Sequence, residues 1–145
     1  ENGPKWAVFN VGVTDGKPES YGGYFAQIGD TEVPQWGNKW RMPDEAELLA
    51  LLNSEKCTAT WVGDFNGVKG LLCTGKVGTI YAGNRVFFPA AGSTYDGNPQ
   101  SDVNDICKYR GSYTRYLYFG EGNQFVSTAT YMWAGYSVRA VLKEQ

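Results

Sequence analysis

One segment of the chain repeats its apolar residues with the period of an α-helix. Residues 43–53 place alanines and leucines at spacings that predict a helix, and acidic residues stand at its start, where the helix dipole favours negative charge. Pro43 suits the first helical turn, and Asn53 ends the pattern. We expect this helix to pack against a core through a broad apolar face, formed by Ala46, Leu48, Leu49, Ala50, Leu51 and Leu52.

The rest of the chain has the pattern of short strands separated by glycine-rich turns. Alternation of apolar and polar residues predicts strands over residues 5–13, 21–28, 58–62, 68–74, 79–82, 85–89, 112–119, 124–128 and 136–142. Trp6, Val8 and Val11 are core candidates in the first of these strands. The sequence Gly120-Glu121-Gly122-Asn123 predicts the turn of a β-hairpin. With no internal repeat and no linker, we expect a single domain over residues 1–145.

Composition excludes several classes of function. The chain has no histidine, so a Ser-His-Asp triad, a Cys-His dyad and a histidine-containing zinc site are impossible. Thirteen Lys and Arg against fifteen Asp and Glu give a net charge of −2, and no basic run exceeds two residues, so we expect no nucleic-acid partner. Apolar stretches fall far short of the roughly 20 residues that span a bilayer, so we expect no membrane insertion.

The three cysteines give no sign of metal or redox chemistry. Cys57, Cys73 and Cys107 are too far apart in the chain for a CxxC motif, and their odd number leaves at least one thiol free. We expect them to serve as small buried hydrophobic residues, while their disulfide status stays open. The chain begins abruptly at Glu1 without a signal peptide, which we interpret as a processed or truncated chain.

A series of short motifs runs through nearly the whole chain in a recognisable order. They are KWA (5–7), YGGYFA (21–26), WRMPxxAE (40–47), CTxTW (57–61), NGVKG (66–70), VFFPAAG (86–92), YLYF (116–119) and GYSVRAV (135–141). In this order they resemble the Fibrobacter succinogenes major paralogous domain family. The resemblance implies an α+β, C-type-lectin-like fold with short mixed β-sheets, one or two helices and long loops. It also implies an extracellular or cell-surface protein, often from Bacteroidetes, or a phage receptor-binding protein, and it carries no single established activity.

Several residues of these motifs are expected to be structural. We interpret Arg41 as a clamp that stacks on aromatic rings or donates to carbonyl oxygens. Phe87, Phe88 and Pro89 are expected to form core and an edge strand, since proline is tolerated only at strand edges and ends. Arg139 is expected to pair with an acidic or carbonyl partner.

The C-terminal third carries the candidate binding residues. Nine aromatic residues fall between residues 109 and 136, and strand alternation places Leu117 and Phe119 on one face and Tyr116 and Tyr118 on the other. If the first pair faces the core, the tyrosines are displayed, and displayed tyrosines are efficient contact residues. The candidate ligand-binding residues are Tyr113, Arg115, Tyr116, Tyr118, Asn123, Tyr131, Trp133 and Tyr136. The competing interpretation, which we favour for Phe119 and Phe125, is that these rings cover a small β core.

We therefore predict a non-catalytic recognition domain that binds a protein or a glycan through this aromatic region. Related C-type-lectin-like proteins are diversified by retroelements in this region, and Thr114-Arg115 departs from the usual motif of the family. The alternative is a structural module of a larger surface or adhesion protein with no ligand of its own. We expect no catalytic residue and no cofactor, and the sequence leaves the oligomeric state open.

Other chemistries find less support. Residues 90–107 form a long polar loop, and its aspartates and asparagines between Asp96 and Asp105 offer oxygen ligands for calcium, but their spacing matches no EF-hand and Asx-turns explain them as well. The helix start also resembles the formylglycine-generating enzymes, whose active site needs two cysteines where only Cys107 lies here. No spacing supports a pair of catalytic carboxylates.

Overall fold

The computed structural model describes residues 5–25, 33, 36, 39–53, 55–75, 84–95, 97–111, 115–128 and 134–142. Its elements in chain order are β1 (Trp40–Arg41), α1 (Glu45–Leu51), β2 (Cys57–Phe65), β3 (Val68–Gly75), β4 (Arg85–Pro89), β5 (Ser93–Tyr95), β6 (Asn98–Pro99), β7 (Ile106–Arg110), β8 (Arg115–Gly120), β9 (Asn123–Thr128), β10 (Ala134–Tyr136) and β11 (Val141–Leu142).

The fold is mostly β, which corrects the predicted α+β, C-type-lectin-like class. Strands make up 49% and helix 7% of the described residues, and the strands form small antiparallel sheets. The prediction followed from the resemblance to the Fibrobacter paralogous domains and from a helix expected over residues 43–53, but α1 has only seven residues, because Asp44 is already its N-cap and the chain leaves the helix at Leu52. One short helix is too small to form a layer of its own.

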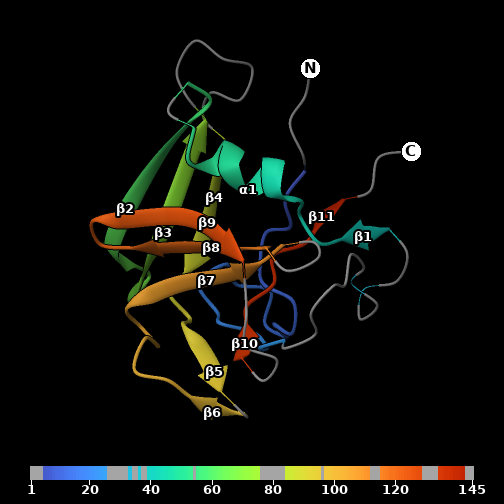
Figure 1. The fold of residues 1–145 in the computed structure, drawn as a ribbon, viewed down its shortest axis with the longest axis vertical. Helices are drawn as coiled ribbons and strands as arrows, with labels where there is room; N and C mark the ends of the chain where they lie inside the picture. Colours follow the sequence, from blue (N-terminus) through green and yellow to red (C-terminus); the bar gives the residue numbers. More distant parts are fainter. Residues whose placement is uncertain are drawn as a thin grey trace.

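Two three-stranded sheets carry the main core. One has the strand order β2-β3-β4 and the other β7-β8-β9, and in Figure 1 the strands of the second run across those of the first, with α1 beside them. The stacked rings of Trp61 from β2 and Phe119 from β8, whose centroids lie 6.0 Å apart, join the two sheets. The buried residues at this junction are Leu48, Leu51, Leu71, Cys73, Phe88, Ala90, Cys107, Tyr109, Leu117 and Phe119.

Two smaller sheets complete the described fold. Strands β10, β5 and β6 form one, and β1 pairs with β11 in the other. The sheet of β1 and β11 pairs Arg41 with Val141 and therefore ties the segment before α1 to the end of the described chain. A second core cluster packs beside it, formed by Ala7, Val11, Val33, Met42, Val138 and Ala140.

Local strand patterns are confirmed where two strands are neighbours in sequence. β4 has the predicted bounds, residues 85–89, and Phe87 and Phe88 are buried on a strand that, among the described strands, pairs only with β3. The predicted hairpin is β8 and β9, with Gly120 opposite Asn123 at the turn.

Cys73 and Cys107 are buried as expected, while Cys57 is half-buried, and all three are free thiols.

Other element predictions were wrong. Residues 5–13 form no strand: Trp6 makes a single bridge to Val141, and Val8, a predicted core residue, is 66% exposed. The predicted closing strand, residues 136–142, is divided between β10 and β11, and the long polar loop contains β5 and β6. Residues 26–28 of the second predicted strand and the whole of 79–82 lie outside the described residues.

The helix also buries less than its pattern indicated. Only Leu48 and Leu51 are buried, whereas Leu49 is 47% exposed and Ala46 lies at the surface. A helix of two turns presents one narrow stripe to the junction of the two sheets, so Leu52 is only partly buried against this core and Ala46 and Leu49 are left at the surface.

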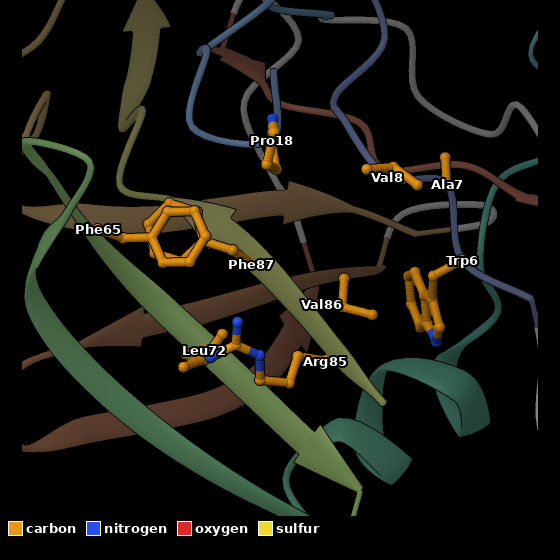
Figure 2. A pocket seen from close by; sticks show the side chains of 9 residues that line it. All are labelled: Trp6, Ala7, Val8, Pro18, Phe65, Leu72, Arg85, Val86 and Phe87. Atoms are coloured by element: carbon orange, nitrogen blue, oxygen red, sulfur yellow. The ribbon is translucent and has the colours of Figure 1, made fainter. Parts of the chain in front are cut away.

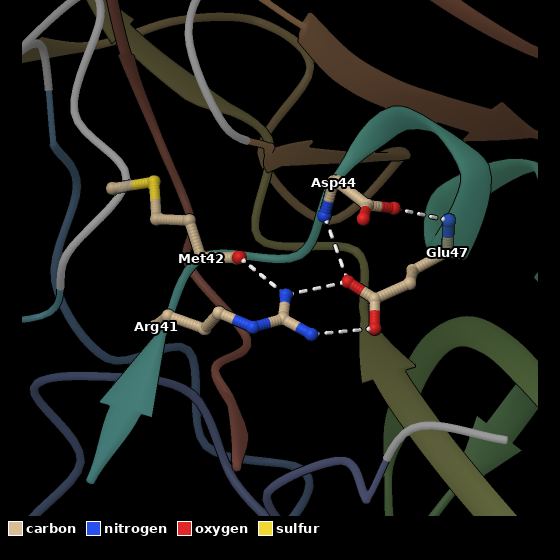
Figure 3. Close-up of polar contacts among 4 residues, drawn as sticks. All are labelled: Arg41, Met42, Asp44 and Glu47. Carbon is tan, nitrogen blue, oxygen red and sulfur yellow. Dashed lines mark hydrogen bonds and ion pairs between the residues drawn. The ribbon is translucent and has the colours of Figure 1, made fainter. Parts of the chain in front are cut away.

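Arg41 is confirmed as a structural clamp at the start of α1. Figure 3 shows its guanidinium donating to the Met42 carbonyl at 3.1 Å and to both carboxylate oxygens of Glu47, at 2.6 and 2.9 Å. Glu47 also accepts from the backbone N–H of Asp44, while the Asp44 side chain accepts from the N–H of Glu47. This reciprocal capping box fixes where the helix begins. Burial alone would raise the pKa of Glu47, but the hydrogen bonds from Arg41 and Asp44 outweigh it and hold the pKa below its usual value.

The E47Q variant tests this clamp. We expect it to lower the free energy of unfolding by about 1 kcal/mol at neutral pH, because the ion pair with Arg41 is lost while the glutamine amide oxygen can still accept from the Asp44 N–H. Since the folded-state pKa of Glu47 is depressed, its contribution is present above the unfolded pKa of about 4.3 and is lost as the pH falls through the folded value. Urea unfolding between pH 3 and 7 should show the variant and the wild type converging only on the acid side. E55Q, at an exposed position, is the control, and a difference that persists undiminished at pH 3 would contradict the assignment.

Candidate aromatic recognition face

The outer face of the β7-β8-β9 sheet collects side chains of similar character. Register places Lys108, Tyr118 and Phe125 opposite one another across the three strands, and Arg110, Tyr116 and Ser127 form the next row. Residues directly opposite in an antiparallel sheet share one face. The other face of β8 carries Leu117 and Phe119, which are buried, so the predicted direction of Tyr116 and Tyr118 away from the core is confirmed.

We define the aromatic face by five residues: Lys108, Tyr116, Tyr118, Phe125 and Tyr136. Its most open part is the stacked pair of Tyr118 and Phe125, whose ring centroids are 4.5 Å apart with an interplanar angle of 8°. Phe125 is 43% exposed, and Tyr118 is half-buried. Each ring restricts the other, so little side-chain entropy remains to be lost when a ligand covers the pair.

Lys108 divides the aromatic face into two halves, an open one with Tyr118 and Phe125 and a second one with Tyr116 and Tyr136. Its Nζ lies 5.9 Å from the ring centroids of both Tyr118 and Tyr136, and 2.7 Å from a carboxylate oxygen of Asp102. Asp102 also accepts from the backbone N–H of Ser93 at 3.0 Å and from its hydroxyl at 2.8 Å. Burial acts to raise the pKa of Asp102, but the hydrogen bonds from Lys108 and Ser93 outweigh it and keep the pKa low. The charge of Lys108 is therefore held in a fixed place between two aromatic rings.

The other half of the face is closed. Tyr136 is only 5% exposed, and its ring lies 5.0 Å from that of Tyr116 and 5.4 Å from the guanidinium of Arg110. Burial raises the pKa of the Tyr136 hydroxyl, and the Lys108 cation opposes the shift. The Nε of buried Arg110 donates to the Phe25 carbonyl at 2.8 Å. Tyr136 thus packs against half-buried Tyr116 and is not itself open to a ligand.

A shallow polar hollow adjoins the open half of the face. It has a volume of about 270 Å³ and shares Tyr118 with the aromatic face. Its polar side chains come from Lys69, Asp105, Glu121 and Asn123, with Lys69 and Asp105 3.6 Å apart in an exposed ion pair. A ligand stacked on Tyr118 would find donors and acceptors beside it, as binding sites with an apolar floor usually provide.

The structure separates the predicted binding residues into three groups. Half-buried Tyr116 and Tyr118 lie on the aromatic face with exposed Asn123 in the adjoining hollow, whereas Tyr136 is buried against Tyr116 and is not displayed as predicted. Arg115 is on the opposite side of β8, where its Nε is 2.9 Å from a carboxylate oxygen of Glu45 in α1. Tyr113, Tyr131 and Trp133 lie outside the described residues.

Two residues of the aromatic face were missed by sequence reasoning. Phe125 was assigned to the core, which was wrong, because it stands opposite Tyr118 and therefore on the outer face. The predicted hairpin, with Gly120 opposite Asn123, already contained this register. Lys108 was missed because the strand β7 fell partly inside a segment interpreted as loop. Its position could be found only from the pairing of β7 with β8.

The geometry of the described residues supports neither the calcium site nor the catalytic cysteine considered as alternatives. Among the described residues, no three of Asp, Glu and Cys lie together as a metal site would require, and Asp102 of the polar loop is engaged by Lys108 and Ser93. Cys107 is buried, and its Sγ lies 3.2 Å from the Phe88 carbonyl. Burial raises the pKa of the Cys107 thiol to about 12, so it is not a reactive thiolate at neutral pH.

No family model, no curated protein and no solved structure matches the chain. The resemblance to the Fibrobacter paralogous domains therefore stays a prediction. In the described part of the chain, no helix is both long and apolar enough to cross a membrane.

Proposed function

We propose that the domain is a non-catalytic recognition module that binds a protein or glycan ligand through the aromatic face. The observation that carries this proposal is the open Tyr118–Phe125 stack beside the fixed charge of Lys108. Exposed aromatic rings next to a cation have the composition of binding hot spots. Both rings also stand on a three-stranded sheet rather than on a loop, which keeps them in place before a ligand arrives.

The setting of the face favours binding over catalysis. Catalytic acids and bases are polar groups whose pKa values are shifted toward neutrality in a cleft. The pKa of Asp102, beside the face, is instead lowered, and its oxygens are occupied by Lys108 and Ser93. An open pair of stacked rings beside a shallow hollow suits a ligand that is recognised and released unchanged.

The proposal extends to the setting of the protein. A recognition module of this kind fits an extracellular or cell-surface protein, or a phage virion protein, as the resemblance to the Fibrobacter paralogous domains implies. Diversification by a retroelement predicts a reverse transcriptase gene nearby and a near-copy of the C-terminal coding region that differs mainly at adenines. A search of the gene neighbourhood checks this part of the proposal separately from ligand binding.

A double variant, Tyr118→Ser with Phe125→Ser, tests the binding proposal. The wild-type protein would be screened on a glycan array and against surface proteins of candidate host cells, and the affinity for each captured ligand would then be measured. We expect the double variant to bind at least about 30-fold more weakly, because two hot-spot rings are removed. Its melting temperature should fall by no more than a few degrees, since both rings stand on the outer face of the sheet and the double variant loses only their stacking and partial burial.

The control is L49S, which removes an equally exposed apolar side chain from α1. Unchanged ligand affinity in the double variant would contradict the aromatic face as the binding site. Absence of any captured ligand, together with unfolding of the double variant, would favour the structural-module alternative.

A further inference from the structure

A separate apolar groove lies between the N-terminal segment and the β2-β3-β4 sheet. It encloses about 190 Å³ and shares no residue with the aromatic face or its hollow. Figure 2 shows Phe65, Leu72 and Phe87 on the side of the sheet, and Trp6, Val8 and Pro18 on the side of the N-terminal segment. The rings of Phe65 and Phe87 are stacked, with centroids 4.1 Å apart and an interplanar angle of 13°.

The walls of the groove are firmly held. Trp6 packs edge-on against Phe88 of the core, with ring centroids 5.6 Å apart. The backbone next to it is fixed by the hydrogen bond from Ala7 N–H to the Ala140 carbonyl, at 2.9 Å. Leu72 and Phe87 stand opposite each other in the β3–β4 ladder. The groove is therefore a formed feature of the fold, and exposed Val8 at its rim extends the apolar surface.

One charged group lines this apolar groove. Arg85 stands two residues before Phe87 on β4, so both side chains project from the same side of the strand. Its guanidinium is exposed and takes part in no ion pair with any described residue. The other side chains lining the groove are apolar apart from the indole N–H of Trp6. A cation without an ion-pair partner among the described residues, set beside an apolar wall, is complementary to a ligand with an apolar body and one negative charge.

We propose that the groove binds a small monocarboxylic acid with an apolar or aromatic body. The guanidinium of Arg85 receives the carboxylate in a bidentate ion pair, and the body lies against Phe65, Leu72 and Trp6. The volume is that of about six water molecules in the liquid, which suits one ring with a short tail and not a drug-sized ligand.

The same features disfavour other ligands. A peptide segment brings backbone N–H and C=O groups that need hydrogen-bond partners, and the apolar side chains of the groove supply none. A phosphate carries more charge than one arginine neutralises, and it gains nothing from apolar walls. A neutral apolar molecule would leave Arg85 unused.

Nuclear magnetic resonance with the isotope-labelled full chain tests the proposal. The indole N–H signal of Trp6, assigned by its absence in W6F, would be followed during titration with phenylpropionate, phenylpropionamide and inorganic phosphate. Ligands of this size bind with dissociation constants of about 1–10 mM. We expect saturable shifts with phenylpropionate, at least about 10-fold weaker binding of the amide, and no saturable shift with phosphate.

R85Q separates the charge from the apolar walls. It should bind phenylpropionate about as weakly as the wild type binds the amide, and K39Q, at an exposed lysine next to β1, should bind like the wild type. Equal affinity for acid and amide, or an unchanged affinity in R85Q, would overturn the proposal. So would the absence of any shift of the Trp6 signal. None of these results depends on the aromatic face, so this inference stands or falls separately from the proposed function.

Discussion

The N10A variant is expected to lose about 3–5 kcal/mol of unfolding free energy, because it removes the side-chain oxygen that accepts a hydrogen bond from Nε of a fully buried arginine. The Nε of Arg139 donates to Oδ1 of Asn10 at 2.8 Å, and its Nη1 donates to the Ala7 carbonyl at 3.3 Å. As predicted from sequence, a carbonyl is among the partners of Arg139. Its guanidinium also lies 4.9 Å from the centroid of the Phe88 ring.

Asn10 is the centre of a buried polar network. Its Nδ2 donates to the Tyr21 carbonyl at 2.9 Å and to the Tyr109 hydroxyl at 2.8 Å, and that hydroxyl donates to the Pro89 carbonyl at 3.0 Å. The network connects the N-terminal segment, the end of β4 and β7. Alanine at position 10 would leave several buried polar groups unpaired at once, and each such group is costly in a medium that excludes water.

A double-mutant cycle separates the charge of Arg139 from the rest of the network. Burial lowers the pKa of Arg139 to about 10, so it is still charged at neutral pH and depends on its acceptors. R139M keeps an apolar stem against Phe88 and removes the charge, and we expect it to cost only about 1–3 kcal/mol. In the N10A background the same change should cost about 2 kcal/mol less, or stabilise the protein.

Urea unfolding of the four proteins measures this coupling. L49A, at an exposed position on α1, provides a distant partner for R139M whose effect should be additive within about 0.5 kcal/mol. Additivity between N10A and R139M would mean that the hydrogen bond between them contributes nothing to stability. If N10A does not fold, the cycle is carried out with N10S, whose hydroxyl retains one possible acceptor.

The features that could be predicted from the sequence are those that depend on residues close together in the chain. The strand at residues 85–89 and the hairpin of β8 and β9 were predictable, because alternation and turn residues are local signals. The displayed side of Tyr116 and Tyr118 followed from the same alternation. Arg41 could be identified as structural because a helix start lies within six residues of it.

What could not be predicted depends on contacts between distant segments. Residues 5–13 alternate like a strand, yet among the described residues they make isolated backbone hydrogen bonds with residues 138–142 and with Gly23, so no ladder forms. Lys108 joins the aromatic face only through the pairing of β7 with β8, and its position is fixed by Asp102 in a segment interpreted as an irregular loop. Tyr136 reaches the face from a different sheet, and no local pattern shows that it is buried beneath Tyr116.

G92A is the second change with a large expected effect, a loss of about 2–5 kcal/mol of unfolding free energy. Gly92 has a φ of +65°, a conformation that costs an L-residue about 1–2 kcal/mol. In addition, an alanine Cβ would lie 2.5 Å from the backbone nitrogen of Val103 and 2.6 Å from the carbonyl carbon of Asp102. Backbone atoms cannot rotate aside, so the segment that carries Asp102 must move.

G97A is the matched control, because it isolates the cost of the left-handed backbone. Gly97 has a φ of +80°, but apart from its chain neighbours its Cβ would meet no atom of the described residues within 4 Å, so we expect a loss of only about 1–2 kcal/mol. The two variants should differ also at the aromatic face. G92A displaces Asp102 from Lys108 and should shift the resonances of Lys108 and Tyr118, whereas G97A should leave them unchanged. Equal destabilisation by the two variants would show that the close approach of the Asp102–Val103 backbone to Gly92 does not constrain the fold. The packing of Gly92 would then not be what holds Asp102, and through it Lys108, in place.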